Sequence, residues 1–236
     1  MGSPLYYASY DGHIDAVRLL LEHGAIIEPY PLMHALIMKH YDVARLLIEW
    51  GMDMCYAFEN TYRNKFMRGI IEHGQYDLVE HALDHIDVDD RIGNYGATML
   101  MIAAEHDRLV IVRLLLDREA DLNLMDNENR KAIHFAANSC ANEVLQLLLE
   151  RGADSSETDG SFRSPLYYAI KLDNVEAVKM LIDHNVAPER IHRLDRSNMV
   201  DPSYMDISKI CTTNETIMDM LLAHYKKGSK HLIQKN

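Results

Sequence analysis

The sequence predicts an all-α protein built from about six to seven copies of one helix–turn–helix unit. Two stretches carry the same wording: residues 97–123 read ATMLMIAAEHDRLVIVRLLLDREADLN, and residues 130–154 read RKAIHFAANSCANEVLQLLLERGAD. A pair of alanines and a triplet of leucines recur in both stretches, 33 residues apart. A fixed period of this length indicates a repeat architecture, in which each unit covers the apolar face of its neighbour.

Copies of this unit can be traced along the whole chain by one marker position, which proline occupies in three of the copies. These positions are Pro4, Pro31, Phe66, Met99, Ala132 and Pro165, with a weak seventh at Met205. The predicted repeats lie near 3–28, 29–55, 60–90, 93–125, 126–158 and 159–190, followed by a degenerate C-terminal capping repeat at 199–228 and a basic tail at 226–236. We therefore expect one domain that spans residues 1–236.

The first copy shows why each unit should form two helices. Ser3 can accept a backbone hydrogen bond at a helix N-terminus, and Pro4 suits the first helical position. Val17, Leu20 and Leu21 recur at the spacing of three to four residues that places apolar side chains on one helix face. This copy predicts a short capped helix followed by a helix with one buried face.

Three copies depart from the regular unit. The second arrives early, with Glu28, Pro29 and Tyr30 in place of a hairpin, so we expect a notch in the surface at this point. The third has the residues 81–83, His-Ala-Leu, where leucines are expected, and is degenerate. The last keeps apolar residues at 217, 221 and 222, which fall on one helical face.

Composition and charge exclude several classes of protein. A formal charge of −12 disfavours general affinity for nucleic acid or for an anionic membrane. No apolar run approaches the roughly 20 residues that a membrane span needs. The three cysteines form neither a CxxC pair nor a disulfide framework, which is typical of a reducing compartment. The expected location is the cytosol, which for a secreted protein would be the cytosol of a host cell.

The repeated wording resembles the ankyrin repeat family. The residues on that family's pattern are Thr98, Leu100, Ala103, Ala104, Ile133, His134, Ala136, Ala137, Gly152, Ala153 and Asp154. The resemblance implies a solenoid of about six to seven helix–turn–helix repeats joined by short hairpin loops and curved around a concave face. It also implies that partners bind at the positions that the pattern leaves free.

Those free positions are the hairpin tips and the outward ends of the first helices. In this sequence they are Tyr10, Asp11, Ile37, Met38, Tyr62, Asn64, Glu72, His73, Tyr95, Glu105, His106, Asn127, Glu128, Arg130, Asn138, Ser139, Ser161, Arg163, Lys171 and Leu172. Tyrosine and methionine are enriched at interface centres. Glu72 and Glu105 favour a partner that carries lysine or arginine. We expect a protein partner with a basic or amphipathic segment, no nucleic acid, no membrane insertion, and a monomeric chain.

Few residues suggest chemistry of their own. His81 and His85 lie four residues apart and share a helix face, but no third metal ligand accompanies them. Cys140 takes a family glycine position without the histidine and asparagine of a cysteine protease, and we expect it to be a small buried thiol. No catalytic residue, cofactor or metal is therefore predicted. Asn123 lies in a context that resembles ankyrin asparagines that become hydroxylated; the alternative is that it only caps its hairpin.

Two functional hypotheses follow from these features. The first is a non-catalytic module that binds a partner protein segment on its concave face. Its repeat sequences are similar in style to those of secreted effectors of intracellular bacteria and of host-range proteins of large DNA viruses. The second is that this chain is the targeting or substrate-recruiting part of a longer enzyme or ubiquitin-ligase-type adaptor, since the first motif begins abruptly at Ser3.

Overall fold

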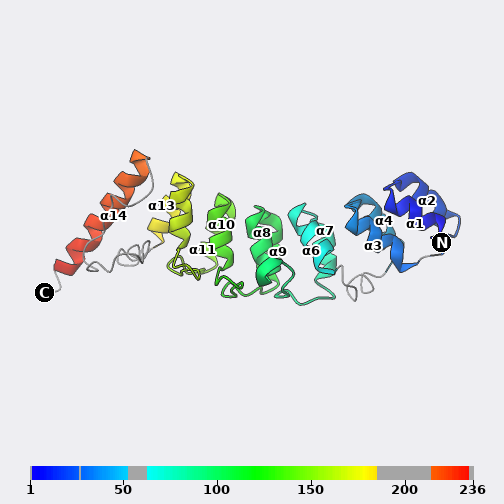
Figure 1. Ribbon diagram of the computed structural model, residues 1–236, viewed down its shortest axis with the longest axis horizontal. Helices are drawn as coiled ribbons and strands as arrows, with labels where there is room; N and C mark the ends of the chain where they lie inside the picture. Colours follow the sequence, from blue (N-terminus) through cyan, green and yellow to red (C-terminus); the bar gives the residue numbers. More distant parts are fainter. Residues whose placement is uncertain (1, 27, 53–62, 185–213, 234–236) are drawn as a thin grey trace. The chain divides into compact units, whose positions relative to one another are not determined.

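The computed structural model describes residues 2–26, 28–52, 63–184 and 214–233 (Figure 1). These residues form thirteen α-helices and one short 3-10 helix, with no β-strand among them and one isolated β-bridge between Arg91 and Thr98. The prediction of an all-α protein is confirmed. No helix among these residues has the length and apolar character needed to cross a bilayer.

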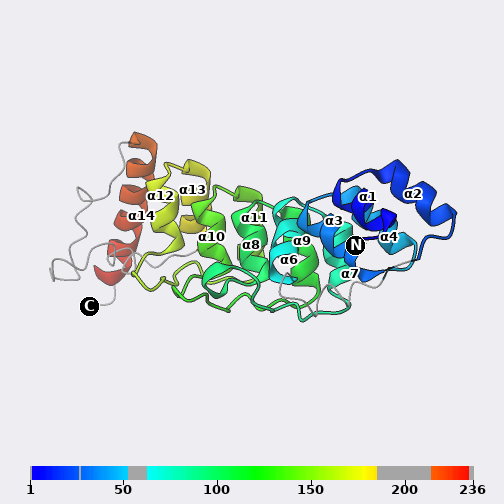
Figure 2. The ribbon, with the colours of Figure 1, turned by 45° about the vertical axis from the view of Figure 1, so that its right-hand side comes forward.

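The helices come in consecutive pairs of a first and a second helix (Figures 1 and 2). The pairs are α1 (Pro4–Tyr10) with α2 (Ile14–Glu22), α3 (Pro29–Ile37) with α4 (Tyr41–Glu49), α6 (Arg63–Glu72) with α7 (Tyr76–Ala82), α8 (Met99–Glu105) with α9 (Leu109–Asp117), α10 (Ala132–Asn138) with α11 (Asn142–Glu150), and α12 (Pro165–Lys171) with α13 (Val175–Asp183). The 3-10 helix η1 (Asn94–Gly96) precedes α8, and α14 (Glu215–Ile233) ends the described chain.

The chain packs into two compact units. Unit 1 comprises residues 1–103 and 110–120, and unit 2 comprises residues 104–109 and 121–236. Within unit 1, the first helices α1 and α3 pack side by side, as do the second helices α2 and α4. Within unit 2, α10 packs against α12, and α11 packs against α13. Each unit therefore stacks first helices on first helices and second helices on second helices.

The core of each unit consists of the residues that recur with the repeat. In unit 1, Leu47, Phe66 and Leu115 are fully buried. In unit 2, the alanine pair Ala136–Ala137 is buried where α10 meets its neighbours, and Leu148 is buried on α11. Small side chains let the helices approach closely, and the leucines fill the layer between them.

The first helix begins at the marker position in four copies and before it in two. Ser3 accepts a hydrogen bond from the Tyr6 N–H at 3.2 Å, as expected of an N-cap, with Pro4 at the first helical position. However, α3 begins at Pro29, two residues before Pro31, and α6 begins at Arg63, three residues before Phe66. Pro29 can begin a helix because the first helical position needs no backbone N–H donor.

The degenerate third copy and the C-terminal segment both contain helices. In the third copy, α7 buries Leu78, Val79 and Ala82, so alanine replaces a leucine in the core. The segment 185–213 lies outside the described residues. Beyond it, α14 is a single helix of 19 residues that packs on α13 and buries Ile217 and Leu221. Most of the expected basic tail is therefore helical, as α14 continues to residue 233.

The turn between the two helices of each pair requires one residue with a left-handed backbone. Its φ angle is positive at every pair: 76° at Gly12, 66° at Lys39, 68° at Gly74, 54° at Asp107, 55° at Cys140 and 52° at Asp173. Glycine adopts this conformation freely, whereas other L-residues are strained in it. Cys140 is exposed, so the expectation of a buried thiol is wrong. The turn lies at the surface, and position 140 is set by its backbone geometry.

Replacing Cys140 by glycine is expected to raise the free energy of unfolding by about 0.5–1 kcal/mol. Relief of the left-handed strain, about 1–2 kcal/mol, outweighs the extra entropy that glycine gives the unfolded chain, about 0.5–1 kcal/mol. Urea denaturation of the wild type and Cys140→Gly measures the gain. Cys140→Ala is the control because it removes the thiol but keeps Cβ, and it should give no gain. An equal gain in both variants would assign the effect to the thiol instead.

Candidate functional site

Two hairpin turns of unit 2 are built to the same design. In the first, the Asp126 N–H donates to the Arg130 carbonyl at 3.0 Å, and the Asp126 carboxylate accepts from the Arg130 N–H and from Arg130 Nε, each at 2.8 Å. In the second, Asp159 makes the same three bonds with Arg163, at 3.0, 2.9 and 2.7 Å. Both aspartate side chains are fully buried. Each buried carboxylate therefore closes its own hairpin.

The same arginines stack on aromatic rings of the following first helix. The Arg130 guanidinium carbon lies 4.6 Å from the centre of the Phe135 ring, and that of Arg163 lies 5.4 Å from the centre of the Tyr168 ring. The Tyr168 hydroxyl also donates to Asp159 at 2.7 Å. Each hairpin tip is thus fixed to its helix by a carboxylate, a guanidinium and a ring, an arrangement that sets where the tip residues lie.

The charges of these groups stabilise one another. Burial alone would raise the pKa of Asp159, but hydrogen bonds from Tyr168, from two backbone N–H groups and from Arg163 outweigh it and hold that pKa below its ordinary value. Burial raises the pKa of the Tyr168 hydroxyl, and its bond to the Asp159 carboxylate raises it further. Arg130 and Arg163 are therefore paired cations, and their positive charge is balanced within the chain by Asp126 and Asp159.

Sequence reasoning missed the two aspartates, although a signal was present. The segments 126–130 and 159–163 read DNENR and DGSFR, and the aspartate and the arginine each recur after 33 residues. Turns favour aspartate, whose side chain accepts hydrogen bonds from backbone N–H groups further along the turn. A repeated Asp-x-x-x-Arg at the hairpin position would have predicted the clamp.

In unit 1, the predicted partner-binding residues lie at helix ends and at one hairpin tip. Tyr10, Asp11, Met38, His73 and Tyr95 are exposed. Ile37 and Glu72 are half-buried. Asn64 is exposed and lies within α6, not in a hairpin. Tyr62 lies outside the described residues.

One predicted acidic site residue of unit 1 already has a basic partner. Glu72 forms an ion pair and hydrogen bond with Arg68, one helical turn earlier on α6. The structure thus compensates its charge within the chain, whereas Asp11 stays exposed at the end of α1. The acidic attraction for a basic partner in unit 1 therefore rests less on Glu72 than the sequence suggested.

In unit 2, the predicted residues again lie at first-helix ends and hairpins, and none of them is buried. The exposed ones are Glu105, Asn127, Glu128, Asn138, Ser161, Lys171 and Leu172, and the half-buried ones are His106, Arg130, Ser139 and Arg163. The two hairpins contact each other, since the Gly160 N–H donates to the Glu128 carbonyl at 2.7 Å. A Cβ at Gly160 would lie 3.0 Å from that oxygen, so glycine permits this close approach.

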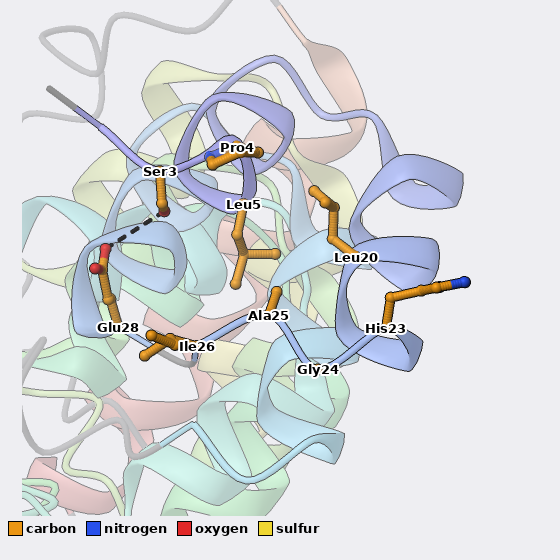
Figure 3. Close-up of a pocket in the computed structure, with 9 residues that line it drawn as sticks. All are labelled: Ser3, Pro4, Leu5, Leu20, His23, Gly24, Ala25, Ile26 and Glu28. Carbon is orange, nitrogen blue, oxygen red and sulfur yellow. Dashed lines mark hydrogen bonds between the residues drawn. The ribbon is translucent and has the colours of Figure 1, made fainter.

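A hollow of about 360 Å³ lies where the second copy arrives early (Figure 3). Its lining includes Leu5 of α1, Leu20 of α2, and Ala25 and Ile26, which follow α2. At its edge the Ser3 hydroxyl donates to the Glu28 carboxylate at 3.4 Å. The hollow lies next to the shortened connection at which the sequence predicted a notch.

His134 is a buried part of the unit 2 framework. Its Nδ1 accepts from the Lys131 N–H at 3.1 Å, so Nε2 carries the proton and donates to the Glu157 carbonyl at 3.2 Å. Burial lowers the pKa of His134, although these contacts oppose the effect. The neutral ring is the form that the fold stabilises.

Acidification should therefore destabilise unit 2 through His134. Because the pKa is lower in the folded state, the stabilisation is complete above the unfolded value of about 6.5 and is lost as pH falls below it. The urea midpoint should drop more between pH 7.5 and 5.5 for the wild type than for His134→Gln. The variant itself should lose about 1–3 kcal/mol at pH 7.5, as its buried hydrogen bonds are impaired. Equal pH dependence in both proteins would assign the acid loss to other histidines.

The candidates for chemistry remain isolated in the structure. The rings of His81 and His85 lie 5.6 Å apart, centre to centre, near the end of α7. Within the described residues, no group of three or more histidine, cysteine or acidic side chains could hold a metal ion. Asn123 is exposed, its N–H donates to the Asp121 carboxylate at 2.8 Å, and its side-chain oxygen lies 3.5 Å from Lys131 Nζ.

Comparison with known protein families gives one result. Residues 2–57, 66–159 and 120–191 match the description "ankyrin repeats (3 copies)". The matches reach all six helix pairs, omit residues 63–65 at the start of α6, and end before α14. Residues 192–236 fall outside them.

Proposed function

Because this chain belongs to the ankyrin repeat family, whose arrays serve as protein–protein interaction modules, we propose that it binds a partner protein segment without catalysing a reaction. The binding surface would consist of the hairpin tips and first-helix ends described above, which correspond to the concave face in this family. The partner would be a basic or amphipathic segment, bound by a monomer of this chain. The proposed location is the cytosol, in keeping with the lone cysteines.

One observation supports this surface above all: large apolar side chains are exposed at positions that the core does not use. These exposed residues are Tyr10, Met38, Tyr95 and Leu172. Tyr10 is the last residue of α1, Met38 and Leu172 follow α3 and α12, and Tyr95 lies in η1. Tyr95 also has a left-handed backbone, with φ of 56°, which is strained for an aromatic residue. Strained, exposed aromatic residues are unfavourable for the fold alone and are typical of binding sites.

The proposal is tested by affinity capture from a eukaryotic host-cell lysate. Wild type, Tyr95→Ala and Val110→Ala serve as baits, and quantitative mass spectrometry compares the captured proteins. Tyr95 and Val110 are matched in exposure, at 64% and 62%, but Val110 lies on the second helix α9 and not at a hairpin tip or a first-helix end. Val110→Ala should capture as much of a partner as the wild type does, and Tyr95→Ala should capture less. The melting temperatures of both variants should equal that of the wild type. Equal capture by all three baits would contradict this surface.

The finer biological role is also a proposal. The wording of the repeats is similar in style to secreted effectors of intracellular bacteria and host-range proteins of large DNA viruses, which would make the partner a host protein. Hydroxylation of Asn123 is a further proposal, supported by its exposure on the hairpin. Intact mass after co-expression with an asparaginyl hydroxylase tests it, since no added oxygen would contradict it.

One observation favours a second role, in which the array recruits a target for another activity. The helix α14 has 19 residues, whereas the helices of the six pairs have seven to ten, and it lies beyond the matched repeats. An appended helix of this kind suits an adaptor that contacts a second protein. Deletion of residues 214–236 should then remove one of two captured partners and leave the other. Loss of both or of neither would contradict the adaptor role.

A further inference from the structure

The first and sixth copies share a six-residue motif, but the motif has different surroundings in the two copies. Residues 3–8 and 164–169 both read SPLYYA, and each motif begins a first helix. Ser3 and Ser164 cap the two helices in the same way, each accepting the N–H of the residue three positions later. The two neighbouring tyrosine rings are also arranged alike: Tyr6 and Tyr7 are 5.2 Å apart at 89°, and Tyr167 and Tyr168 are 5.5 Å apart at 86°.

The surroundings of the second tyrosine differ. In the sixth copy, Tyr168 is only 6% exposed and lies beneath the Arg163 guanidinium, whose charge is balanced by Asp159. In the fifth copy, Phe135 has the same position, is 7% exposed, and lies beneath Arg130. In the first copy, Tyr7 is 54% exposed, and the residue at the arginine position is Gly2. The first copy thus has the ring but not the guanidinium.

An acidic side chain lies on the same face of α1 as this ring. Asp11 follows Tyr7 by four residues and keeps helical backbone angles, and its N–H donates to the Tyr7 carbonyl at 3.0 Å. Side chains four residues apart on a helix are neighbours on its surface. Both Tyr7 and Asp11 are exposed, so a ring face and a carboxylate are presented together. The folded hairpins combine the same two groups around an arginine.

The charge of this part of unit 1 suits a cationic partner. Residues 1–52 contain six acidic and three basic side chains. Of the basic ones, Arg45 is paired with Asp77, and Lys39 lies 3.5 Å from the ring of His73. A guanidinium is planar, stacks on aromatic faces and forms hydrogen bonds with a carboxylate at its edge, whereas an ammonium group cannot match both contacts in this way.

We propose that Tyr7 and Asp11 form a binding subsite for an arginine side chain of a partner protein. The guanidinium of that arginine stacks on the Tyr7 ring and pairs with the Asp11 carboxylate, as Arg163 does with Tyr168 and Asp159 within the chain. This subsite deepens the proposed binding function and rests on it. It adds Tyr7 to the surface, a residue that the repeat pattern did not single out.

The test uses the full chain and a phage library of random linear 12-residue peptides. Peptides enriched by the wild type should share an arginine, and one of them is then synthesised in two forms, with that arginine intact and replaced by alanine. Tyr7→Ala should weaken the intact peptide about 2- to 30-fold, the range for one cation–π contact, whereas Tyr7→Phe should bind within about twofold of wild type. Leu19→Ala, an exposed position on α2 of the same copy, should bind as wild type does.

A double-mutant cycle decides whether the ring and the arginine meet. Replacing the peptide arginine should weaken binding to the Tyr7→Ala protein less than binding to the wild type, because only the contact of the arginine with Asp11 remains in that variant. Melting temperatures of all variants should match, because Tyr7 and Leu19 are exposed. Enriched peptides without a shared arginine, or independent effects of the two changes, would overturn the subsite and leave the binding function standing. The absence of any enriched peptide would contradict both.

Discussion

Replacing Asp159 by alanine is expected to lower the free energy of unfolding by about 3–5 kcal/mol, the usual cost of breaking a buried charge pair by removing one partner. The Asp159 carboxylate accepts from the N–H groups of Ser161 and Arg163, from Arg163 Nε and from the Tyr168 hydroxyl. Alanine leaves the Tyr168 hydroxyl buried without this acceptor and leaves the Arg163 guanidinium against the ring without its counter-charge. Urea denaturation followed by circular dichroism measures the loss.

Arg163→Ala is the matched control for Asp159→Ala. It removes the other member of the same pair, but Asp159 keeps two backbone donors and the Tyr168 hydroxyl, and the Arg163 side chain is one-third exposed. We expect a clearly smaller loss, of about 1–2 kcal/mol. If Arg163→Ala costs as much as Asp159→Ala, the ion pair itself would hold the hairpin, and the carboxylate's other hydrogen bonds would contribute little.

Acid should reproduce the Asp159→Ala effect in the wild type. The pKa of Asp159 is lower in the folded state than in the unfolded chain, so its stabilisation is complete above the unfolded value of about 3.9 and is lost as pH falls through the folded value. The difference in unfolding free energy between the wild type and Asp159→Ala should therefore shrink below about pH 4. A difference that stays constant down to pH 2.5 would contradict this account.

The fold was predictable from the sequence because its core is periodic. The alanine pairs and leucine triplets of the fourth and fifth copies stand 33 residues apart, and all of these residues except the half-buried Leu116 are buried in their units. The early start of α3 has a local cause that the period does not contain. Pro29 begins a helix because proline fits the first helical position, and this signal is independent of the repeat.

The character of the candidate site was less predictable because it depends on pairings between side chains. The sequence presented Arg130, Arg163 and Glu72 as free charges, whereas the structure pairs them with Asp126, Asp159 and Arg68. Which of two neighbouring charges remains available depends on turn geometry and on helix register, which a count of residue types does not capture. Cys140 illustrates the same limit: its environment follows from a left-handed turn, not from its apolar character.

Differences between copies of the repeat carry functional information. A motif that is satisfied in one copy and incomplete in another distinguishes structural residues from available ones. Tyr168 and Tyr7 occupy the same position, and only the first is covered by an arginine of its own chain. Both copies read SPLYYA and differ at the preceding residue, Gly2 or Arg163, but this difference alone does not establish the distinction. It requires the position and exposure of each ring.

Replacing Leu148 by alanine is expected to cost about 2–5 kcal/mol of unfolding free energy, the range for a fully buried leucine. Leu148 and its neighbours Leu147 and Leu149 are buried on α11, which packs on α10 and α13. A repeat has no core of its own, so a cavity here weakens the contacts with neighbouring copies as well as the copy itself. Leu172→Ala removes the same atoms from an exposed position of unit 2 and should change stability by less than about 0.5 kcal/mol. Urea denaturation compares the two variants with the wild type, and amide hydrogen exchange locates the weakened helices. If Leu148→Ala cost no more than Leu172→Ala, the leucine triplet would not stabilise the stack, and the 33-residue period would not mark the core.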